Sequence, residues 1–485
     1  MNAEPKGSIA LDARLLIGGS WVAGAEERWL PIVDPSTAEP VGRVAVASDA
    51  DLERAVAAAQ RGFAVWRAVA PFDRARTLRQ AATLLRERAD TIAAVLTMEQ
   101  GKPVSQARHE VLGSADVIDW FAEEGKRCFG QMIPGRTGPT HVLTRLEPVG
   151  PVAGLTPWNF PVSQSVKKMA AALAAGCSIV LKGPEEAPGA CAEMVRCFID
   201  AGLPPGVVGL LYGNPPHISG YLIAHPAIRH VTLTGSVAVG RAVAALAGRH
   251  LKPLTLELGG HAPAIVCEDA DLALAAAELA RMKFMNAGQV CLAPTRFIVA
   301  RPVYREFLDR FRELAQRLRV DAGHLPNVDM GPLANLRRLE AIEALVDDAV
   351  KHGAAVECGG RRLDRPGYFY APTVLSDVPV AARAMNEEPF GPLALFRAFD
   401  TLDEAIAEAN RLAYGLGSYL FTRSIANEAA VTERIEAGMV AVNRVFSSNI
   451  EAPFGGVKDS GYGTEGGTLA IRSFLHEKMV ARFVG

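Results

Sequence analysis

Apolar residues recur at three- and four-residue spacing in the N-terminal part of the chain. Residues 51–68 and 75–100 both carry this spacing, which predicts amphipathic helices with one buried face. Asp51 is the expected start of the first helix. Gly101 is the expected end of the second, because glycine commonly follows the last residue of a helix.

After Pro148 the pattern changes to short β-branched runs that alternate with helical segments. The expected strands are residues 149–156, 178–182, 207–212, 230–234, 254–257, 263–266 and 296–300. The expected helices are residues 162–175, 188–201, 217–224, 236–247, 272–285, 303–319 and 336–352. This alternation predicts an α/β fold, with a parallel sheet that carries helices on both faces.

Three further stretches have weaker patterns. Residues 321–333 contain glycine, proline and asparagine and are expected to form a loop, and residues 133–139 are expected to be a linker or turn. The tail from Arg472 alternates weakly and is expected to be a strand. Because an uncovered edge strand invites pairing, we expect this strand to meet a partner subunit.

The composition is that of an ordinary globular protein. The 485 residues are 49% hydrophobic and 21% charged, which predicts two or three domains with a sizeable core. The net charge of −2 lacks the positive excess that non-specific nucleic-acid binding needs. The apolar stretch 169–181 is too short to span a bilayer, and residues 1–15 lack the apolar core of a signal peptide. We therefore expect a cytoplasmic protein that binds neither nucleic acid nor membrane.

The seven cysteines are an odd number, so they cannot all pair within one chain, and they indicate a reducing compartment. No two of them have the C-x-x-C spacing of a zinc site, and no metal is expected. Cys291 is a candidate nucleophile, because it follows a predicted helix and lies among small residues. The other cysteines are expected to be apolar filler, and they are Cys128, Cys177, Cys191, Cys197, Cys267 and Cys358.

The segment 232–241 follows an apolar strand and opens a helix, where backbone N–H groups favour a phosphate. Gly235 and Gly240 have the spacing of a P-loop. Arg241 and Ala242, however, replace the Lys-Ser/Thr pair that binds phosphates and Mg²⁺. An ATPase is therefore disfavoured, and an ordinary strand-to-helix turn is an equally good interpretation.

Two polar residues are candidates for catalysis. Glu257 ends an apolar run and is either a solvated strand end or a buried general base with a raised pKa. Asn159 lies between aromatic residues and prolines and is either an ordinary turn residue or an oxyanion donor. Taken singly, each residue favours the ordinary interpretation.

Taken together, the motifs resemble the aldehyde dehydrogenase superfamily from about Leu16 to the C-terminus. They have that family's order and spacing: Trp158-Asn159, Lys182-Gly183-Pro184-Glu185, Gly235-Ser236, Glu257, Cys291, Glu388-Pro389-Phe390-Gly391-Pro392 and Pro453-Phe454-Gly455-Gly456-Val457-Lys458-Asp459-Ser460-Gly461. The resemblance implies a Rossmann-like NAD-binding domain (1–126 and 149–259), an α/β catalytic domain (260–449) and a small β oligomerisation arm with the C-terminal segment (127–148 and 450–485). It also implies a homodimer or homotetramer.

The same resemblance implies the catalytic roles. Cys291 would attack the aldehyde as a thiolate, and Asn159 with the Cys291 backbone N–H would hold the oxyanion. After hydride transfer to the nicotinamide, Glu257 would activate the water that hydrolyses the thioester. Lys168 would give electrostatic support. A non-catalytic NAD-binding relative, the alternative from another class, would be expected to have lost the nucleophile or the base.

The cofactor residues also follow from the resemblance. Lys182 and Glu185 match positions that contact the adenosine ribose, and a glutamate there would repel a 2′-phosphate, so NAD⁺ is expected. Gly183, where many relatives have proline, would loosen the backbone and leaves NADP⁺ open. The expected cofactor contacts are Thr156, Pro157, Trp158, Lys182, Glu185, Gly235, Ser236, Gly240, Leu258, Glu388 and Phe390.

Within the superfamily the chain is most similar to the succinate-semialdehyde and α-ketoglutarate-semialdehyde dehydrogenases, which commonly bind a distal carboxylate with two arginines and a serine. The serine matches Ser448, but the arginine positions hold Lys167 and Met285. A lysine is a single point charge and a methionine makes only apolar contact, so a short dicarboxylic semialdehyde would lose much of its anchor.

We therefore expect a broader or more apolar aldehyde, with a semialdehyde bound through Lys167, or succinate semialdehyde itself, as the alternatives. The expected pocket consists of Phe160, Gln164, Lys167, Met285, Val290, Leu292, Ser448 and Phe454.

Overall fold

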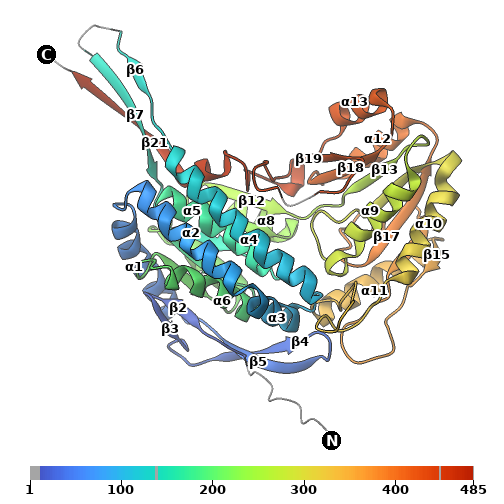
Figure 1. Cartoon of the computed structure of the whole chain (residues 1–485), viewed down its shortest axis with the longest axis horizontal. Helices are drawn as coiled ribbons and strands as arrows, with labels where there is room; N and C mark the ends of the chain where they lie inside the picture. The colour runs from blue at the N-terminus through green and yellow to red at the C-terminus, as the bar shows by residue number, and fades with distance from the viewer. Residues whose placement is uncertain (1–10, 137–139, 447–448, 484–485) are drawn as a thin grey trace, which may run out of the picture.

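The computed structural model of the chain describes residues 11–136, 140–446 and 449–483. Two large sheets with flanking helices form the body, and a narrow sheet projects from one end of it (Figure 1). Each large sheet has its own apolar core. The predicted α/β class is confirmed, and no helix in these ranges is long and apolar enough to cross a membrane.

The first large sheet has eight strands in the order β20-β12-β11-β8-β9-β10-β2-β3. The bounds are β2 Leu15–Ile17, β3 Ser20–Val22, β8 Val152–Leu155, β9 Ile179–Lys182, β10 Val208–Leu211, β11 His230–Gly235, β12 Leu254–Leu258 and β20 Gly461–Tyr462. The chain runs from β8 through β9 to β10 on one side, and β11 then pairs with the other side of β8. Doubly wound sheets bind ligands at the carboxyl ends of the strands where the order reverses, which here lies between β8 and β11.

Helices cover this sheet on both faces, as the alternating pattern predicts. Those between its strands are α5 Pro161–Ala175, α6 Pro188–Asp200, α7 Pro215–Ala224 and α8 Val237–Arg249, and those before them are α1 Asp49–Trp66, α2 Pro71–Glu87, α3 Ala89–Gln100 and α4 Val104–Glu124. α2 and α4 lie together across the front in Figure 1. A small sheet of β1 Leu11–Ala13, β5 Glu39–Ala45 and β4 Trp29–Asp34 lies below them.

The second large sheet has seven strands in the order β15-β16-β17-β14-β13-β18-β19. The bounds are β13 Pro263–Val266, β14 Arg296–Ala300, β15 Ala355–Cys358, β16 Thr373–Ser376, β17 Leu393–Phe399, β18 Gly417–Phe421 and β19 Met439–Val442. Its helices are α9 Leu272–Phe284, α10 Tyr304–Arg317, α11 Leu336–Lys351, α12 Leu402–Asn410 and α13 Ile425–Arg434. All neighbouring strands are parallel except β15 and β16.

The projecting sheet is antiparallel and joins distant parts of the chain. It consists of β6 Met132–Pro134, β7 Thr140–Pro148 and β21 Leu475–Phe483. The predicted C-terminal strand is therefore confirmed, and it lies at an edge; its pairing with a partner subunit stays a prediction. The prediction of a linker or turn over residues 133–139 is wrong at Ile133 and Pro134, which belong to β6 and pair with β7; residues 137–139 lie outside the described residues.

Two helix predictions also need correction. α1 begins after Ser48, whose side chain accepts the Asp51 N–H while the Asp51 carboxylate accepts the Ser48 N–H, so Asp51 lies inside the first turn. Residues 75–100 form two helices, because Arg88 has a non-helical backbone (φ −96°, ψ 6°). Gly101 ends α3 with a left-handed backbone (φ 92°), as expected.

Candidate active site

The candidate nucleophile, base and oxyanion donor come from three elements that converge. Asn159 follows β8, Glu257 lies near the end of β12, and Cys291 follows the short 3₁₀ turn Met285–Gly288. The Asn159 amide donates to the carbonyl of Gln289, two residues before Cys291 (3.1 Å). A Cβ added to Gly260, three residues after Glu257, would lie 2.9 Å from the Cys291 carbonyl oxygen.

A strained turn presents Cys291. Asn286 and Ala287 have left-handed backbones (φ 49° and 52°), which cost non-glycine residues about 1–3 kcal/mol each. Gly288 (φ 71°) cannot be replaced, since a Cβ there would lie 2.1 Å from the Gly391 carbonyl oxygen. The Asn286 side chain donates to the Asn159 carbonyl (3.1 Å), so this strained turn is bonded directly to the candidate oxyanion donor.

The Cys291 thiol is half-buried, whereas Glu257 is only 2% exposed. Burial, and then the charge of Glu257, raise the pKa of the Cys291 thiol well above its usual value. A thiolate at this position therefore needs a neighbouring proton acceptor.

Glu257 fits the buried general base rather than the solvated strand end. No N–H or O–H group of the described residues donates to either of its carboxylate oxygens. Burial, with a further contribution from the Glu465 carboxylate, raises the pKa of Glu257 to about 7. A carboxylate with this pKa is partly charged at neutral pH and can accept a proton there.

Asn159 is buried, and its side chain has one donor to spare. An asparagine amide carries two N–H groups, and the Gln289 carbonyl accepts from it at 3.1 Å. The second N–H has no hydrogen-bond partner among the described residues, and the first is bonded two residues before Cys291.

Lys168 belongs to a buried cluster next to Glu257. Its ammonium donates to Glu465 Oε1 and to Thr234 Oγ1, both at 2.5 Å. Glu465 exchanges backbone hydrogen bonds with Phe454 (2.7 and 2.8 Å), which joins the cluster to the expected substrate pocket. Glu465 was not among the expected residues, because it lies 297 positions from Lys168 and has no local motif.

Most of the expected cofactor residues lie at or just after the carboxyl ends of β8, β9, β11 and β12, and Glu388 and Phe390 come from the segment before β17. Ser236 caps α8 by accepting the Val239 N–H (3.4 Å). The first turn of α8, which begins here, is largely exposed. Gly240 allows close packing, since a Cβ there would lie 2.4 Å from the Leu258 side chain. The rings of Trp158 and Phe390 meet edge to face, with centroids 5.6 Å apart.

The Glu388 carboxylate packs against Gly259 and Gly260, which follow β12. Its Oε1 accepts the Gly260 N–H (2.9 Å), and a Cβ on Gly259 would lie 2.3 Å from its Oε2. Burial raises the pKa of Glu388 to about 7. A side chain on Gly259 would therefore displace the Glu388 carboxylate.

At the end of β9, the Lys182 ammonium donates to Glu185 Oε2 (2.5 Å), and the Gly213 N–H donates to Glu185 Oε1 (2.8 Å). The Thr156 hydroxyl donates to the Lys182 carbonyl (3.1 Å). The expected loose backbone at Gly183 is wrong. A Cβ there would lie 2.5 Å from the Tyr212 ring, so a glycine is needed because any side chain would clash with that ring.

The substrate side of Cys291 is mostly apolar, with one cation. Phe160, Met285 and Phe454 are half-buried and pack against the same core as Cys291, with Val290 and Leu292 buried beside them. The Lys167 ammonium lies 3.8 Å from the centroid of the Phe454 ring, and it forms no ion pair with a described carboxylate. Gln164 accepts from Thr234 (3.3 Å) and thus belongs to the Lys168 cluster, and Ser448 lies outside the described residues.

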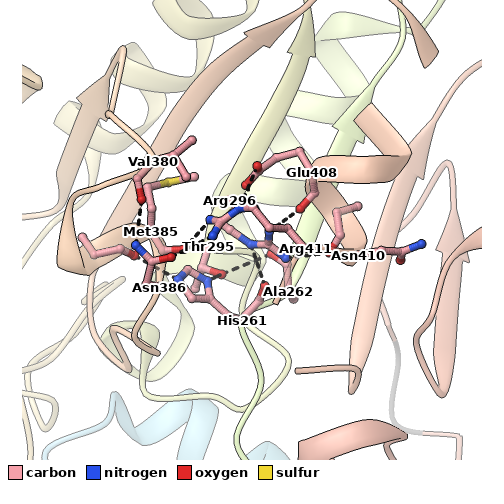
Figure 2. Close-up of polar contacts among 12 residues, drawn as sticks. His261, Ala262, Thr295, Arg296, Val380, Met385, Asn386, Glu408, Asn410 and Arg411 are labelled. Carbon is pink, nitrogen blue, oxygen red and sulfur yellow. Dashed lines mark hydrogen bonds and ion pairs between the residues drawn. The ribbon is translucent and has the colours of Figure 1, made fainter. Parts of the chain in front are cut away.

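A buried polar network ties the segment after Glu257 to the segment after Cys291 (Figure 2). Thr295 Oγ1 lies 2.7 Å from His261 Nδ1, and the other ring nitrogen of His261 donates to the Ala384 carbonyl (2.9 Å). Burial lowers the pKa of His261 well below its usual value, so the ring is neutral. Arg296 donates to the carbonyls of His261 (3.1 Å), Glu408 (2.7 Å) and Ala409 (2.9 Å), which fixes both segments to the end of α12.

The remaining cysteines stay apart from this site. Cys177, Cys191, Cys197 and Cys267 are buried, Cys128 and Cys358 are half-buried, and all are free thiols. Within the described ranges no group of three or more His, Cys, Asp or Glu side chains could hold a metal ion.

Comparisons with known proteins agree along nearly the whole chain. The model of the family described as "Aldehyde dehydrogenase family" matches residues 21–480. A putative 4-(hydroxymethyl)benzenesulfonate dehydrogenase of Comamonas testosteroni is 49% identical over 466 residues, which are 96% of this chain and 97% of that protein. Succinate-semialdehyde dehydrogenase [NADP(+)] of Escherichia coli is 37% identical over 464 residues, 96% of either chain. The crystal structure of succinate-semialdehyde dehydrogenase from Burkholderia pseudomallei has a TM-score of 0.96 at 37% identity and covers 100% of both chains.

Proposed function

The chain belongs to the aldehyde dehydrogenase family, and from this membership we propose that Cys291, Glu257 and Asn159 carry out its NAD(P)-dependent oxidation of an aldehyde to a carboxylic acid. The main support is the pairing of the Cys291 thiol with a buried carboxylate that accepts no N–H or O–H donor. Asn159 adds an amide that donates one N–H to the carbonyl of Gln289, two residues before Cys291, and has a second N–H to offer.

The first half of the reaction forms a bond to sulfur. Glu257 accepts the thiol proton, and the sulfur of Cys291 attacks the carbonyl carbon to give a thiohemiacetal. The free N–H of Asn159 and the backbone N–H of Cys291 donate to the oxygen as its charge develops. A bound nicotinamide supplies the acceptor for the hydride, and a thioester on Cys291 remains.

In the second half, Glu257 first releases the thiol proton to solvent and then accepts a proton from water, while the oxygen of that water attacks the thioester carbon. The carbon–sulfur bond breaks, the acid leaves, and the sulfur regains its charge. The pKa of about 7 suits Glu257 for this step, because the group is both available as a base and strong enough to act near neutrality.

The residues at the strand reversal fit a dinucleotide. Ser236 and the first turn of α8 would hold the pyrophosphate, Lys182 and Glu185 the adenosine ribose, and Glu388 with Phe390 the nicotinamide ribose and ring. We infer a preference for NAD⁺. The Lys182 charge is paired with Glu185, so a 2′-phosphate would meet a neutralised cation and a carboxylate.

We further propose that the NAD-binding domain is 1–126 with 149–259, the catalytic domain 260–449, and the arm 127–148 with the C-terminal segment 450–485. The long edge strand β21 supports assembly into a homodimer or homotetramer through that arm. The odd number of free thiols supports a location in the cytoplasm.

The substrate that fits best is an aromatic aldehyde with one anionic group at the far end of its ring. Phe160, Met285 and Phe454, which pack against the same core as Cys291, would suit an aromatic ring, and the Lys167 ammonium beside the Phe454 ring would suit the anionic group. A single ammonium suits a sulfonate, whose charge is spread over three oxygens, better than a planar carboxylate, which an arginine fork would match. The 49% identical relative, a putative 4-(hydroxymethyl)benzenesulfonate dehydrogenase, supports this choice.

A panel of aldehydes with both cofactors tests this proposal. We expect kcat/KM to fall in the order 4-sulfobenzaldehyde, benzaldehyde, succinate semialdehyde and α-ketoglutarate semialdehyde, with NAD⁺ preferred to NADP⁺. A preference for the two semialdehydes would overturn the aromatic assignment and favour succinate-semialdehyde dehydrogenase proper. No turnover of any aldehyde would overturn the activity itself.

A further inference from the structure

A buried ion pair from the N-terminal helices lies directly behind Asn159. Lys102 precedes α4 and Glu110 lies within it; both side chains are 1% exposed, and the Lys102 ammonium lies 2.5 Å from Glu110 Oε2. The same ammonium donates to the Asn159 carbonyl (2.7 Å) and lies 4.0 Å from the centroid of the Phe160 ring. All three directions of the ammonium group are therefore occupied.

The other oxygen of Glu110 holds the beginning of α5. It accepts the N–H groups of Val162 (3.0 Å) and Ser163 (3.1 Å), which no side chain of α5 itself satisfies. A helix leaves its first N–H groups without internal partners, so this carboxylate supplies the missing cap. Lys102 therefore holds the backbone just before Phe160, and Glu110 holds the backbone just after it.

Asn159 is fixed from the other side as well. Its carbonyl also accepts from the Asn286 side chain (3.1 Å), and its amide donates to Gln289 (3.1 Å). One amide N–H is anchored, and the direction of the second then depends on where the backbone of Asn159 lies. A displacement of about 1 Å in an active site can cost about 10²-fold in rate.

We propose that Lys102 and Glu110 are positioning residues, which aim the free N–H of Asn159 at the oxyanion by holding its carbonyl and the start of α5. This inference rests on the proposed function, in which Asn159 is the oxyanion donor. Neither residue is among the expected substrate or cofactor contacts; the hydrogen bonds of their side chains are with each other and with Asn159, Val162 and Ser163.

Glu99 provides a matched control, because it also caps the start of a helix but forms no hydrogen bond with Asn159. Glu99, at the end of α3, accepts the N–H groups of Gly189 (2.7 Å) and Ala190 (3.0 Å) at the start of α6. It is fully buried, like Glu110, but none of the described lysines or arginines forms an ion pair with it. The helix that it caps carries none of the candidate catalytic residues.

The test is a double-mutant cycle on the rate of NADH formation in a single turnover. The positioning variant is Lys102→Met/Glu110→Gln, which leaves no unpaired buried charge and keeps an amide oxygen for the α5 cap. It is combined with Asn159→Ala, and Glu99→Gln is the control. The aldehyde is 4-sulfobenzaldehyde, or the aldehyde that the panel ranks above it.

We expect the positioning variant to slow this step about 10- to 100-fold, with the KM for NAD⁺ unchanged, while Glu99→Gln stays within about threefold of the parent. In the Asn159→Ala background the positioning variant should have no further effect, because residues that act through one group are not additive. A parent-like rate, or effects that multiply, would overturn the positioning role. If Asn159→Ala alone leaves the rate unchanged, the oxyanion role of Asn159 fails first.

If the positioning variant does not fold, Lys102→Met alone is measured in the same cycle, with Tm recorded for every variant. A loss of rate in proportion to a loss of Tm, shared by Glu99→Gln, would show a purely structural cap and would also overturn the proposal.

Discussion

The cofactor side and the substrate side of Cys291 are built differently. On the cofactor side, the backbone packs closely: a Cβ on Gly288 would lie 2.1 Å from the Gly391 carbonyl oxygen, and a Cβ on Gly240 or Gly259 would displace the side chain of Leu258 or Glu388. On the substrate side, the expected contacts come from side chains, such as Lys167 beside the Phe454 ring and Met285 against the core. The reaction therefore depends on backbone geometry, whereas the choice of aldehyde depends on a few side chains.

The largest effect is expected for a variant that loses the reaction but keeps cofactor binding. Cys291→Ala should abolish aldehyde-dependent NADH formation, by about 10⁴-fold or more, because no other group can form the thioester. NAD⁺ binding, measured by calorimetry, should stay within about twofold, since the cofactor side does not use the thiol. Turnover near the parent rate would remove Cys291 from the mechanism.

The next effect should be confined to the substrate side. Lys167→Met should lower kcat/KM for 4-sulfobenzaldehyde about 10- to 100-fold, because one charge-assisted contact is lost. Benzaldehyde is the internal control and should lose clearly less than 4-sulfobenzaldehyde; some loss is expected, because the Lys167 charge lowers the pKa of both Glu257 and Cys291. The KM for NAD⁺ should change by less than about threefold. Equal losses for both aldehydes would mean that Lys167 supports the site rather than the anionic group.

A smaller effect should appear in the pH profile of the hydrolytic step. Glu257 accepts a proton only as a carboxylate, and its pKa is about 7. Below that pH, kcat limited by hydrolysis should fall about tenfold per unit, and above it the contribution of Glu257 should level off. A rate limited by hydrolysis that stays flat down to pH 5 would show that another group is the base.

The alternation of strands and helices between residues 149 and 352 could be predicted, because apolar runs recur between helices at regular spacing. The strands β15 to β19 were not predicted; β15, β16 and β17 follow one another without a long helix between them, so that alternation is missing there. The break at Arg88 also escaped prediction, because the apolar period continues through it.

At the site, Cys291, Glu257 and Asn159 could be named from motifs, but their surroundings could not. Whether Glu257 is solvated depends on β20, which reaches β12 from the far end of the chain. Lys102, Glu110 and Glu465 act through contacts of long sequence separation, and no local pattern marks them. The Gly183 prediction failed for the same reason, since Tyr212 is distant in sequence.

The most direct test of the account is the fate of Cys291 when hydrolysis is blocked. Glu257→Gln is mixed with NAD⁺ and 4-sulfobenzaldehyde in alkaline buffer, where hydroxide can take the thiol proton, and the protein is analysed by mass spectrometry. We expect a burst of about one NADH per subunit, and an acyl group on Cys291 that is absent from Cys291→Ala/Glu257→Gln. Steady turnover at the parent rate, or NADH formation without an acyl group on Cys291, would contradict the account.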